Sequence, residues 1–174
     1  NFAENGIKFL DRDQPENAQQ NLTHINQQVH RISRIIKSLK AFARKEKETI
    51  QPTDLSKVVQ DCLSVSDHRL RMEGVSVVQK GINQPITVMG GHVRLQQSVV
   101  NLLSNAIDAM AGQPDKTIEL EVMQSNEMVQ LTVADNGPGI DNPARVFEPF
   151  YSTKQQGASK GMGLGLSISY GIIA

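Results

Sequence analysis

The chain has 174 residues, with 18 basic and 18 acidic side chains that balance to a formal net charge of zero. This balance argues against a nucleic-acid surface or an acidic tail, and an aromatic content of 4% without tryptophan argues against base-stacking platforms. Cys62 is the only cysteine, which excludes an internal disulfide and is typical of a reducing compartment. No run of about 18 apolar residues occurs, so we expect no membrane contact from this piece.

Residues 1–49 predict a helical hairpin. Residues 1–10 form a short helix, Asp13 and Pro15 mark a turn, and residues 16–47 form a long helix. Its apolar positions recur at spacings of three and four, an unbroken heptad ladder: Leu22, Ile25, Val29, Ile32, Ile36, Leu39 and Ala43. Because one helix cannot bury such a stripe alone, we expect two hairpins to join as a dimeric four-helix bundle. The alternative is that the helix packs on the domain that follows it.

Residues 50–174 alternate helices and strands, which predicts an α+β domain with a mixed or antiparallel sheet covered on one face. A short strand near residue 50 precedes a helix at 55–67. Branched side chains predict strands at 75–78, 85–89, 118–123 and 128–134, the last two joined as a hairpin. We expect the other helices at 92–111 and from the last glycine cluster to the chain end.

The stretch from Gln97 to Met110 predicts a buried amphipathic helix that carries two asparagines, Asn101 and Asn105. They are four residues apart, so their amides lie on one helix face. Amides in so apolar a helix need partners. The partner is either a local group or a hard cation such as Mg²⁺ on the Asn105 carbonyl oxygen.

Asp135 ends a predicted strand and is followed by Gly137 and Gly139. A carboxylate there can accept a hydrogen bond from an exocyclic amine such as that of adenine, and the glycines let a ring approach the backbone. Ordinary hairpin chemistry is the alternative reading of these residues.

Alternate glycines at 161, 163 and 165 precede the last predicted helix, so their N–H groups suit phosphates. The polar stretch at 155–160 could fold over a bound nucleotide as a lid. Lys154 and Lys160 are the cations available for phosphate charge, or else they are solvated loop charges. The Gly-x-Gly-x-Gly spacing of these glycines differs from the Gly-x-Gly-x-x-Gly fingerprint of dinucleotide-binding proteins, so we do not expect a Rossmann site.

Three motifs carry a family resemblance together, with Phe147-Glu-Pro-Phe150 between the last two. They are Asn101-Leu-Leu-Ser-Asn105-Ala, Asp135-Asn-Gly137-Pro-Gly139-Ile and Gly161-Met-Gly163-Leu-Gly165-Leu. They resemble the ATP-binding domain of sensor histidine kinases, in the superfamily that includes gyrase, Hsp90 and MutL. The hairpin resembles the dimerisation and phosphotransfer domain of these kinases, and its Phe42-Ala-Arg-Lys45 ending is most similar to nitrogen-regulation and C4-dicarboxylate sensors. The family fold is a dimeric four-helix bundle followed by an α/β sandwich.

The resemblance implies a role for each motif position. Asn105 would ligate Mg²⁺ on the ATP phosphates with the help of Asn101, and Asp135 would bind the adenine amine beside Gly137 and Gly139. Lys154 would join the two asparagines as a catalytic residue. Further contacts with the nucleotide or anchors of the lid would be Phe147, Phe150, Thr153, Lys154, Gly161, Gly163, Leu164, Gly165 and Leu166.

One position separates the subclasses of this superfamily. Hydrolytic relatives carry a glutamate four residues before the magnesium asparagine, where it activates water. Asn101 stands there in this chain and cannot act as a strong base, whereas a neutral histidine nucleophile needs none. The resemblance therefore implies phosphoryl transfer to histidine, for relay to an aspartate in the receiver domain of a response regulator.

The chain departs from the family pattern at both ends. None of its histidines (His24, His30, His68 and His92) precedes the acid and proline of the acceptor motif, so we expect the acceptor upstream of Asn1. The family domain also continues past the last helix with another hairpin. We therefore expect a cytoplasmic piece of a longer, membrane-anchored protein. A non-catalytic nucleotide-binding dimerisation module and a true ATPase remain the alternatives.

Overall fold

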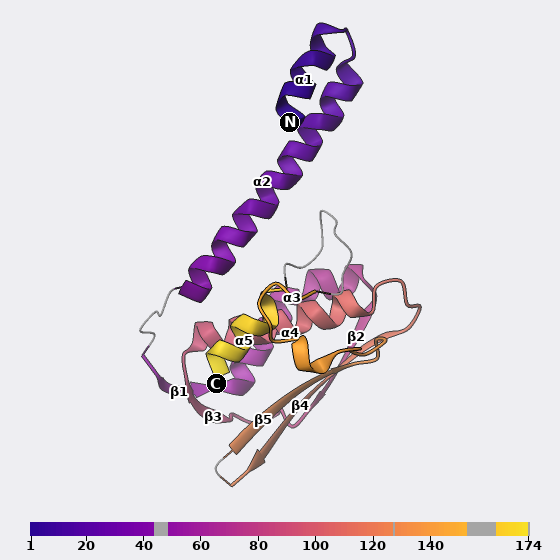
Figure 1. Cartoon of the computed structure of the whole chain (residues 1–174). Helices are drawn as coiled ribbons and strands as arrows, with labels where there is room; N and C mark the ends of the chain where they lie inside the picture. The colour runs from indigo at the N-terminus through magenta and orange to yellow at the C-terminus, as the bar shows by residue number, and fades with distance from the viewer. Residues whose placement is uncertain (44–48, 127, 153–162, 174) are drawn as a thin grey trace. The chain divides into compact units, whose positions relative to one another are not determined.

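The computed structural model describes residues 1–43, 49–126, 128–152 and 163–173 (Figure 1). The chain separates Asn1–Lys45 from a second compact unit made of Glu46–Tyr151 and Gly163–Ala174. The first unit holds helices α1 (Phe2–Asp11) and α2 (Pro15–Ala43). The expected boundary between residues 49 and 50 stays a prediction.

The α1–α2 hairpin is closed by small side chains. Asn1 caps α1 by accepting a hydrogen bond from the Glu4 N–H at 3.0 Å, and Pro15 starts α2 in the first turn, where its missing N–H costs nothing. Gly6, Ala18 and Asn21 are buried where the helices meet. The heptad ladder is not covered by α1, because Leu22, Val29, Ile32 and Ile36 remain 51–62% exposed. Leu39 lies outside the side chains that the structure describes.

The second unit is an α+β domain with a mixed sheet, as predicted. It contains β1 (Gln51–Asp54), α3 (Leu55–Met72), β2 (Val75–Lys80), β3 (Thr87–Gly90), α4 (His92–Ala109), β4 (Lys116–Ser125), β5 (Met128–Asp135), the short 3-10 turn η1 (Pro143–Arg145) and α5 (Gly165–Ile173). β1 and β3 form a small antiparallel pair. In the larger sheet β4 lies between β2, which is parallel to it, and β5, which is antiparallel. The predicted end of α3 at Asp67 is wrong, because Leu70 is buried and the helix continues to Met72.

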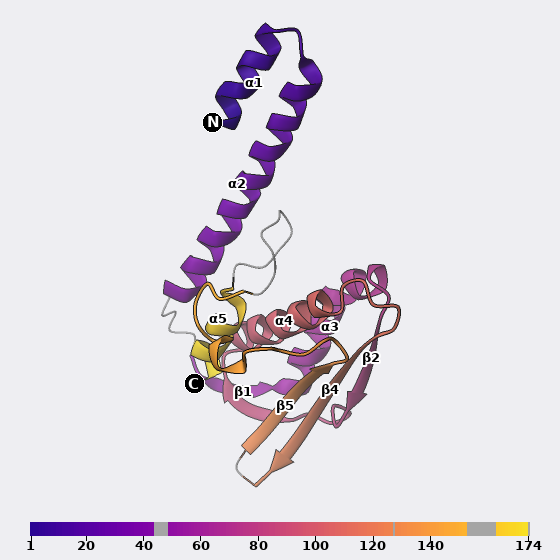
Figure 2. The same ribbon diagram turned by 45° about the vertical axis from the view of Figure 1, so that its right-hand side comes forward.

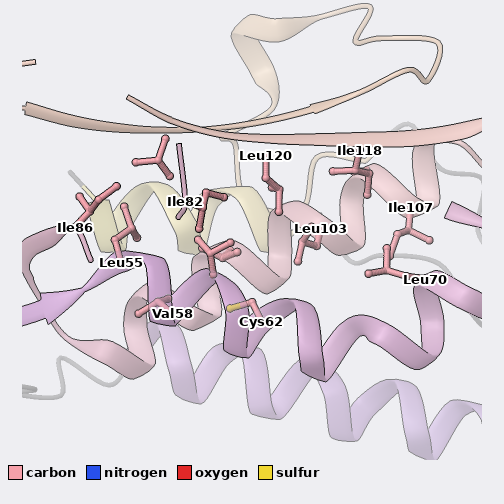
Figure 3. Packing of buried hydrophobic residues seen from close by; sticks show 14 of the residues in the cluster. Leu55, Val58, Cys62, Leu70, Ile82, Ile86, Leu103, Ile107, Ile118 and Leu120 are labelled. Atoms are coloured by element: carbon pink, nitrogen blue, oxygen red, sulfur yellow. The ribbon is translucent and has the colours of Figure 1, made fainter. Parts of the chain in front are cut away.

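The core lies between one face of the large sheet and helices α3 and α4 (Figure 2). Figure 3 shows Val58 and Cys62 of α3 and Leu103 of α4 packed beneath Ile118 and Leu120 of β4. Burial, with a smaller contribution from the Asp61 carboxylate, raises the pKa of the Cys62 thiol to about 11. Cys62 is therefore a packed, protonated thiol and not a reactive one. None of the helices in the described ranges is long and apolar enough to cross a membrane.

Asp54 connects the start of α3 to the chain segment before β3. Its Oδ1 accepts hydrogen bonds from the backbone N–H groups of Ser56 at 3.0 Å and Ile86 at 3.2 Å, and from that of Lys57 at 3.4 Å. It is therefore both a helix cap and a tertiary contact.

We expect Asp54→Ala to lower the free energy of unfolding by about 1–3 kcal/mol, because it leaves backbone donors without an acceptor. Urea unfolding followed by circular dichroism measures this change. Asp67→Ala is the matched control, since Asp67 pairs with Arg71 on the exposed side of the same helix and should cost less than about 0.5 kcal/mol. Equal losses in the two variants would contradict the assignment.

Candidate functional site

Helix α4 carries a buried face and a polar face. Leu103 and Met110 are fully buried against the sheet, whereas Asn101 and Asn105 are only half-buried. Asn101, Asn105 and Ala109 follow one another at intervals of four residues along the polar face. They make a stripe about 12 Å long at 1.5 Å per residue. We call these three residues the α4 stripe.

The first residue of the α4 stripe is hydrogen-bonded to α5. The Asn101 Nδ2 donates to the Gly165 carbonyl oxygen and to the Ser169 hydroxyl, both at 3.3 Å. Gly165 lies so near that an added Cβ would stand 3.7 Å from the Asn101 Cγ. The amide nitrogen of Asn101 thus holds the N-terminus of α5, and its carbonyl oxygen is left to accept a further contact. The sequence prediction missed the role of Ser169, for which the available signal was a serine within an otherwise apolar helix.

The second residue of the stripe has no hydrogen-bond partner among the described residues. The half-buried Asn105 amide makes no side-chain hydrogen bond there, although amides at such positions are normally paired. Its carbonyl oxygen is the kind of ligand that a hard cation prefers. The described residues contain no cluster of three histidine, cysteine or acidic side chains that could hold a metal by themselves. A cation here would therefore share its coordination between Asn105 and a ligand that brings its own oxygens.

The far end of the stripe faces the loop after β5. Asp135 ends β5 opposite Ile118, and its Oδ1 accepts the Gly137 N–H at 2.9 Å. The rest of this exposed carboxylate faces solvent. A Cβ at Gly137 would stand 2.6 Å from that Oδ1 and 3.3 Å from the Ala109 Cβ, so a larger residue where the loop meets α4 would displace the Asp135 carboxylate.

Asn136 holds this loop in place, a role that the sequence prediction missed. Its side chain accepts the Thr117 N–H at 2.9 Å and donates to the Asp115 carbonyl oxygen at 3.1 Å. These bonds join the residue after β5 to the start of β4. An Asn between a strand-ending Asp and Gly was the available signal, because such side chains readily bond to backbone groups. Gly139, two residues on, adopts a left-handed backbone with φ +82°.

The segment after η1 is joined to the start of α5. The Phe147 ring packs against the Tyr170 ring of α5 at a tilt of 41°, with centroids 5.2 Å apart, and the Phe150 N–H donates to the Gly163 carbonyl oxygen at 2.9 Å. Phe150 contributes through its backbone, since its ring is exposed and its φ is +68°. A Cβ at Gly163 would stand 2.3 Å from the Tyr151 carbonyl oxygen, so no larger residue fits there.

The remaining expected site residues divide into two groups. Leu164 is buried and Leu166 is half-buried at the start of α5, so both support this helix. Thr153, Lys154 and Gly161 lie outside the described residues, as does Lys160.

The three parts of the site lie along one helix in a fixed order. A carboxylate acceptor and a glycine loop stand at the Ala109 end, an unpaired amide stands in the middle, and the N-terminus of α5 stands at the Asn101 end. A helix N-terminus favours anions. The arrangement suits an elongated ligand with a hydrogen-bond donor at one end and negative charge at the other.

The chain is similar to known proteins in sequence and in fold. Residues 90–174 match the family of histidine kinase-, DNA gyrase B-, and HSP90-like ATPases. The chain is 36% identical over 170 residues to the C4-dicarboxylate transport sensor protein DctB of Pseudomonas aeruginosa, which covers 96% of this chain and 28% of that protein. It is 33% identical over 180 residues to DctB of Rhizobium meliloti, with 99% and 28% covered. The chain thus spans less than a third of the length of these curated relatives.

Solved structures agree with these matches. The catalytic domain of histidine kinase ThkA has a TM-score of 0.63 at 26% identity and covers 72% of this chain and 80% of that one. The histidine kinase AdeS of Acinetobacter baumannii has a TM-score of 0.65 over 98% of this chain and 81% of that one, and its 18% identity supports the fold alone. The expected resemblance, including the C4-dicarboxylate subgroup, is confirmed. Residues 90–174 therefore match the family of histidine kinase-, DNA gyrase B-, and HSP90-like ATPases, and the chain is similar in sequence to sensor proteins and in structure to a histidine kinase catalytic domain.

Proposed function

We propose that this domain binds Mg-ATP along the α4 stripe and transfers the γ-phosphoryl group to a histidine, for relay to an aspartate of a response regulator. The unpaired Asn105 amide carries the proposal, because it stands between a carboxylate that can accept the adenine amine and a helix N-terminus that can receive phosphates. Relatives named as C4-dicarboxylate transport sensors support the assignment.

Each residue of the stripe and its neighbours has a definite task in this proposal. Asp135 accepts the adenine amine with the carboxylate oxygen that Gly137 leaves free, while the missing side chain at Gly137 admits the ring. Asn105 supplies an amide oxygen to Mg²⁺, with Asn101 as a second oxygen donor. When bound, Mg²⁺ neutralises charge on the transferring phosphoryl group. Lys154 and Thr153, with the glycines at 161, 163 and 165, are proposed for the phosphates.

Asn101 directs the reaction toward transfer. A water-attacking ATPase needs a base to take a proton from water, and a carboxamide is too weak a base. In addition, the side-chain nitrogen of Asn101 already donates hydrogen bonds to Gly165 and Ser169 of α5. A neutral imidazole attacks without such help. Phosphoryl transfer to histidine is therefore the reaction that these side chains support best.

We infer that the acting unit is a dimer formed through α2. In the exposed ladder, Leu22, Val29 and Ile36 recur every seven residues and Ile32 stands three residues after Val29, a heptad pattern that suits the same stripe of a second copy. α1 does not cover these four side chains, because its Gly6 faces Asn21 on another side of α2.

For nucleotide binding, we expect Asp135→Ala to weaken Mg-ATP by about ten- to a hundredfold, because a charged acceptor is lost. Asn105→Ala should remove the dependence of binding on Mg²⁺. Calorimetric titration with and without Mg²⁺ measures both effects. Asp141→Ala removes the same charge from an exposed position of the same loop and should bind like the parent chain. Equal weakening by both aspartate variants would refute the adenine contact.

For the reaction, we expect this chain with labelled Mg-ATP to release little phosphate alone. It should label a supplied bundle segment of a relative that carries the acceptor histidine, and the label should be lost in acid and kept in base. Rapid phosphate release without an acceptor would favour the ATPase alternative. Nucleotide binding with neither transfer nor release would favour the non-catalytic module.

For assembly, we expect Val29→Glu to weaken the dimer at least about tenfold, because a buried charge in the seam lacks a partner. Sedimentation velocity over a concentration series measures the change. Gln28→Glu adds the same charge at the neighbouring exposed position and should leave the dimer intact. A monomeric parent chain would contradict the assignment of α2 to the dimer interface.

A further inference from the structure

Helix α5 buries two serines that have different hydrogen-bond partners. Ser167 is 8% exposed and Ser169 is 7% exposed, although a buried hydroxyl is costly unless it is hydrogen-bonded. The Ser167 hydroxyl donates to the Leu164 carbonyl oxygen at 2.9 Å, directly before its own helix. The Ser169 hydroxyl instead accepts from the Asn101 Nδ2 of α4 at 3.3 Å. Ser167 therefore belongs to the local structure of α5, whereas Ser169 acts on a residue of the α4 stripe.

The contacts of Asn101 decide which way its side-chain amide points. A carboxamide has a donor nitrogen on one branch and an acceptor oxygen on the other, and the two branches are nearly equal in size. The Gly165 carbonyl oxygen can only accept, so the branch that faces it at 3.3 Å must be the nitrogen. Ser169 lies one helical turn after Gly165, and these two acceptors match the two N–H groups of Nδ2 in number. The Asn101 oxygen is therefore on the branch that α5 does not use.

This orientation determines which atom Asn101 offers to a ligand. Asn101 shares the polar face of α4 with Asn105, and its Oδ1 has no hydrogen-bond partner among the described residues. A hard cation takes oxygen ligands and is repelled by N–H groups, so a reversed amide would present the wrong atom. The Gly165 acceptor belongs to the backbone and is present whatever side chain stands there. Ser169 is thus the side chain, among those that the structure describes, that adds a second restraint on the amide.

We propose that Ser169 is a positioning residue, which holds the Asn101 amide with its oxygen directed to the metal and phosphate end of the site. The inference rests on the proposed function and adds to it a determinant three residues beyond the last sequence motif. A second acceptor restrains rotation of the amide, which lowers the entropy lost when the oxygen binds a ligand. Such an oriented oxygen acts only on the metal-dependent part of nucleotide binding. A contact that only held α5 against α4 would change nucleotide binding with and without Mg²⁺ alike.

The test is calorimetric titration of the full chain with ATP, once in excess Mg²⁺ and once in EDTA. The ratio of the two affinities is the Mg²⁺ coupling, which should be well above one in the parent chain. We expect Ser169→Ala to lower this coupling about threefold to tenfold, because a hydrogen bond that orients the Asn101 amide is lost. The affinity for ATP in EDTA should change by less than about twofold, since the phosphates still meet the N-terminus of α5.

Ser167→Ala is the matched control. Ser167 is in the same helix and is about as buried as Ser169, and the variant loses the same hydroxyl, but the partner of Ser167 is Leu164 and not Asn101. The Mg²⁺ coupling of this variant should stay within about twofold of the parent value. Equal losses of coupling in the two serine variants would overturn the proposal, because the stability of α5 would then be the cause. Circular dichroism establishes whether each variant folds.

Further outcomes decide between the two levels of inference. Parental Mg²⁺ coupling in Ser169→Ala, including equal weakening of ATP with and without Mg²⁺, would overturn the positioning role while the nucleotide site stands. If Ser169→Ala does not fold, Ser169→Cys decides in its place, because a thiol is close to a hydroxyl in size but accepts hydrogen bonds only weakly. Parental coupling in that variant would overturn the proposal. No ATP binding by the parent chain would overturn this inference together with the proposed function, and binding that is independent of Mg²⁺ would overturn it together with the metal assignment.

Discussion

The catalytic domain depends on helix α4, which packs one face into the core and presents its polar face to the site. Leu103 of α4 and Met110, which directly follows this helix, are fully buried in the core, so the helix cannot rotate without opening the core. That packing fixes Asn101 and Asn105 on the opposite side, whether or not a ligand is present. The amides are thus positioned in advance by apolar contacts on the far side of the helix, which lowers the entropy lost on binding.

The segments around the site approach one another closely because glycine residues stand at their points of contact. Gly137 meets Ala109, Gly165 meets Asn101, and Gly163 fits against Tyr151 where no Cβ could stand. Phe150 adopts a left-handed backbone, which costs about 1–2 kcal/mol in a residue with a side chain. Its N–H bond to Gly163 helps to hold that conformation. The strain at Phe150 therefore lies beside the site, where the chain must turn sharply between η1 and α5.

The sequence pattern predicted the helices and strands whose buried side chains recur at regular intervals. It did not predict features that depend on contacts between distant parts of the chain. The 3.6-residue period of α4 and the alternation of β4 were sufficient, because the buried side chains lie at regular intervals. The end of α3 was predicted too early, since only the burial of Leu70 by the rest of the fold extends the pattern. The bonds from Arg69 to Asp108 and from Asn101 to Ser169 join positions 39 and 68 residues apart. No spacing rule within a motif contains that information, and Asn105 remains the site residue for which the sequence argument was strongest.

The two units of the chain differ in how far they bury their apolar side chains. The catalytic domain buries its apolar residues in its own core, whereas α2 exposes four ladder residues that would each contribute about 1.5–3 kcal/mol if fully buried. A helical hairpin of this size rarely folds stably alone, because too little of its surface is removed from water. Paired in a dimer, eight half-exposed ladder side chains would supply several kcal/mol, comparable to the whole stability of a small domain. The stability of the hairpin and the assembly of the dimer would then be one equilibrium, so that a change in the α2 ladder would alter both together.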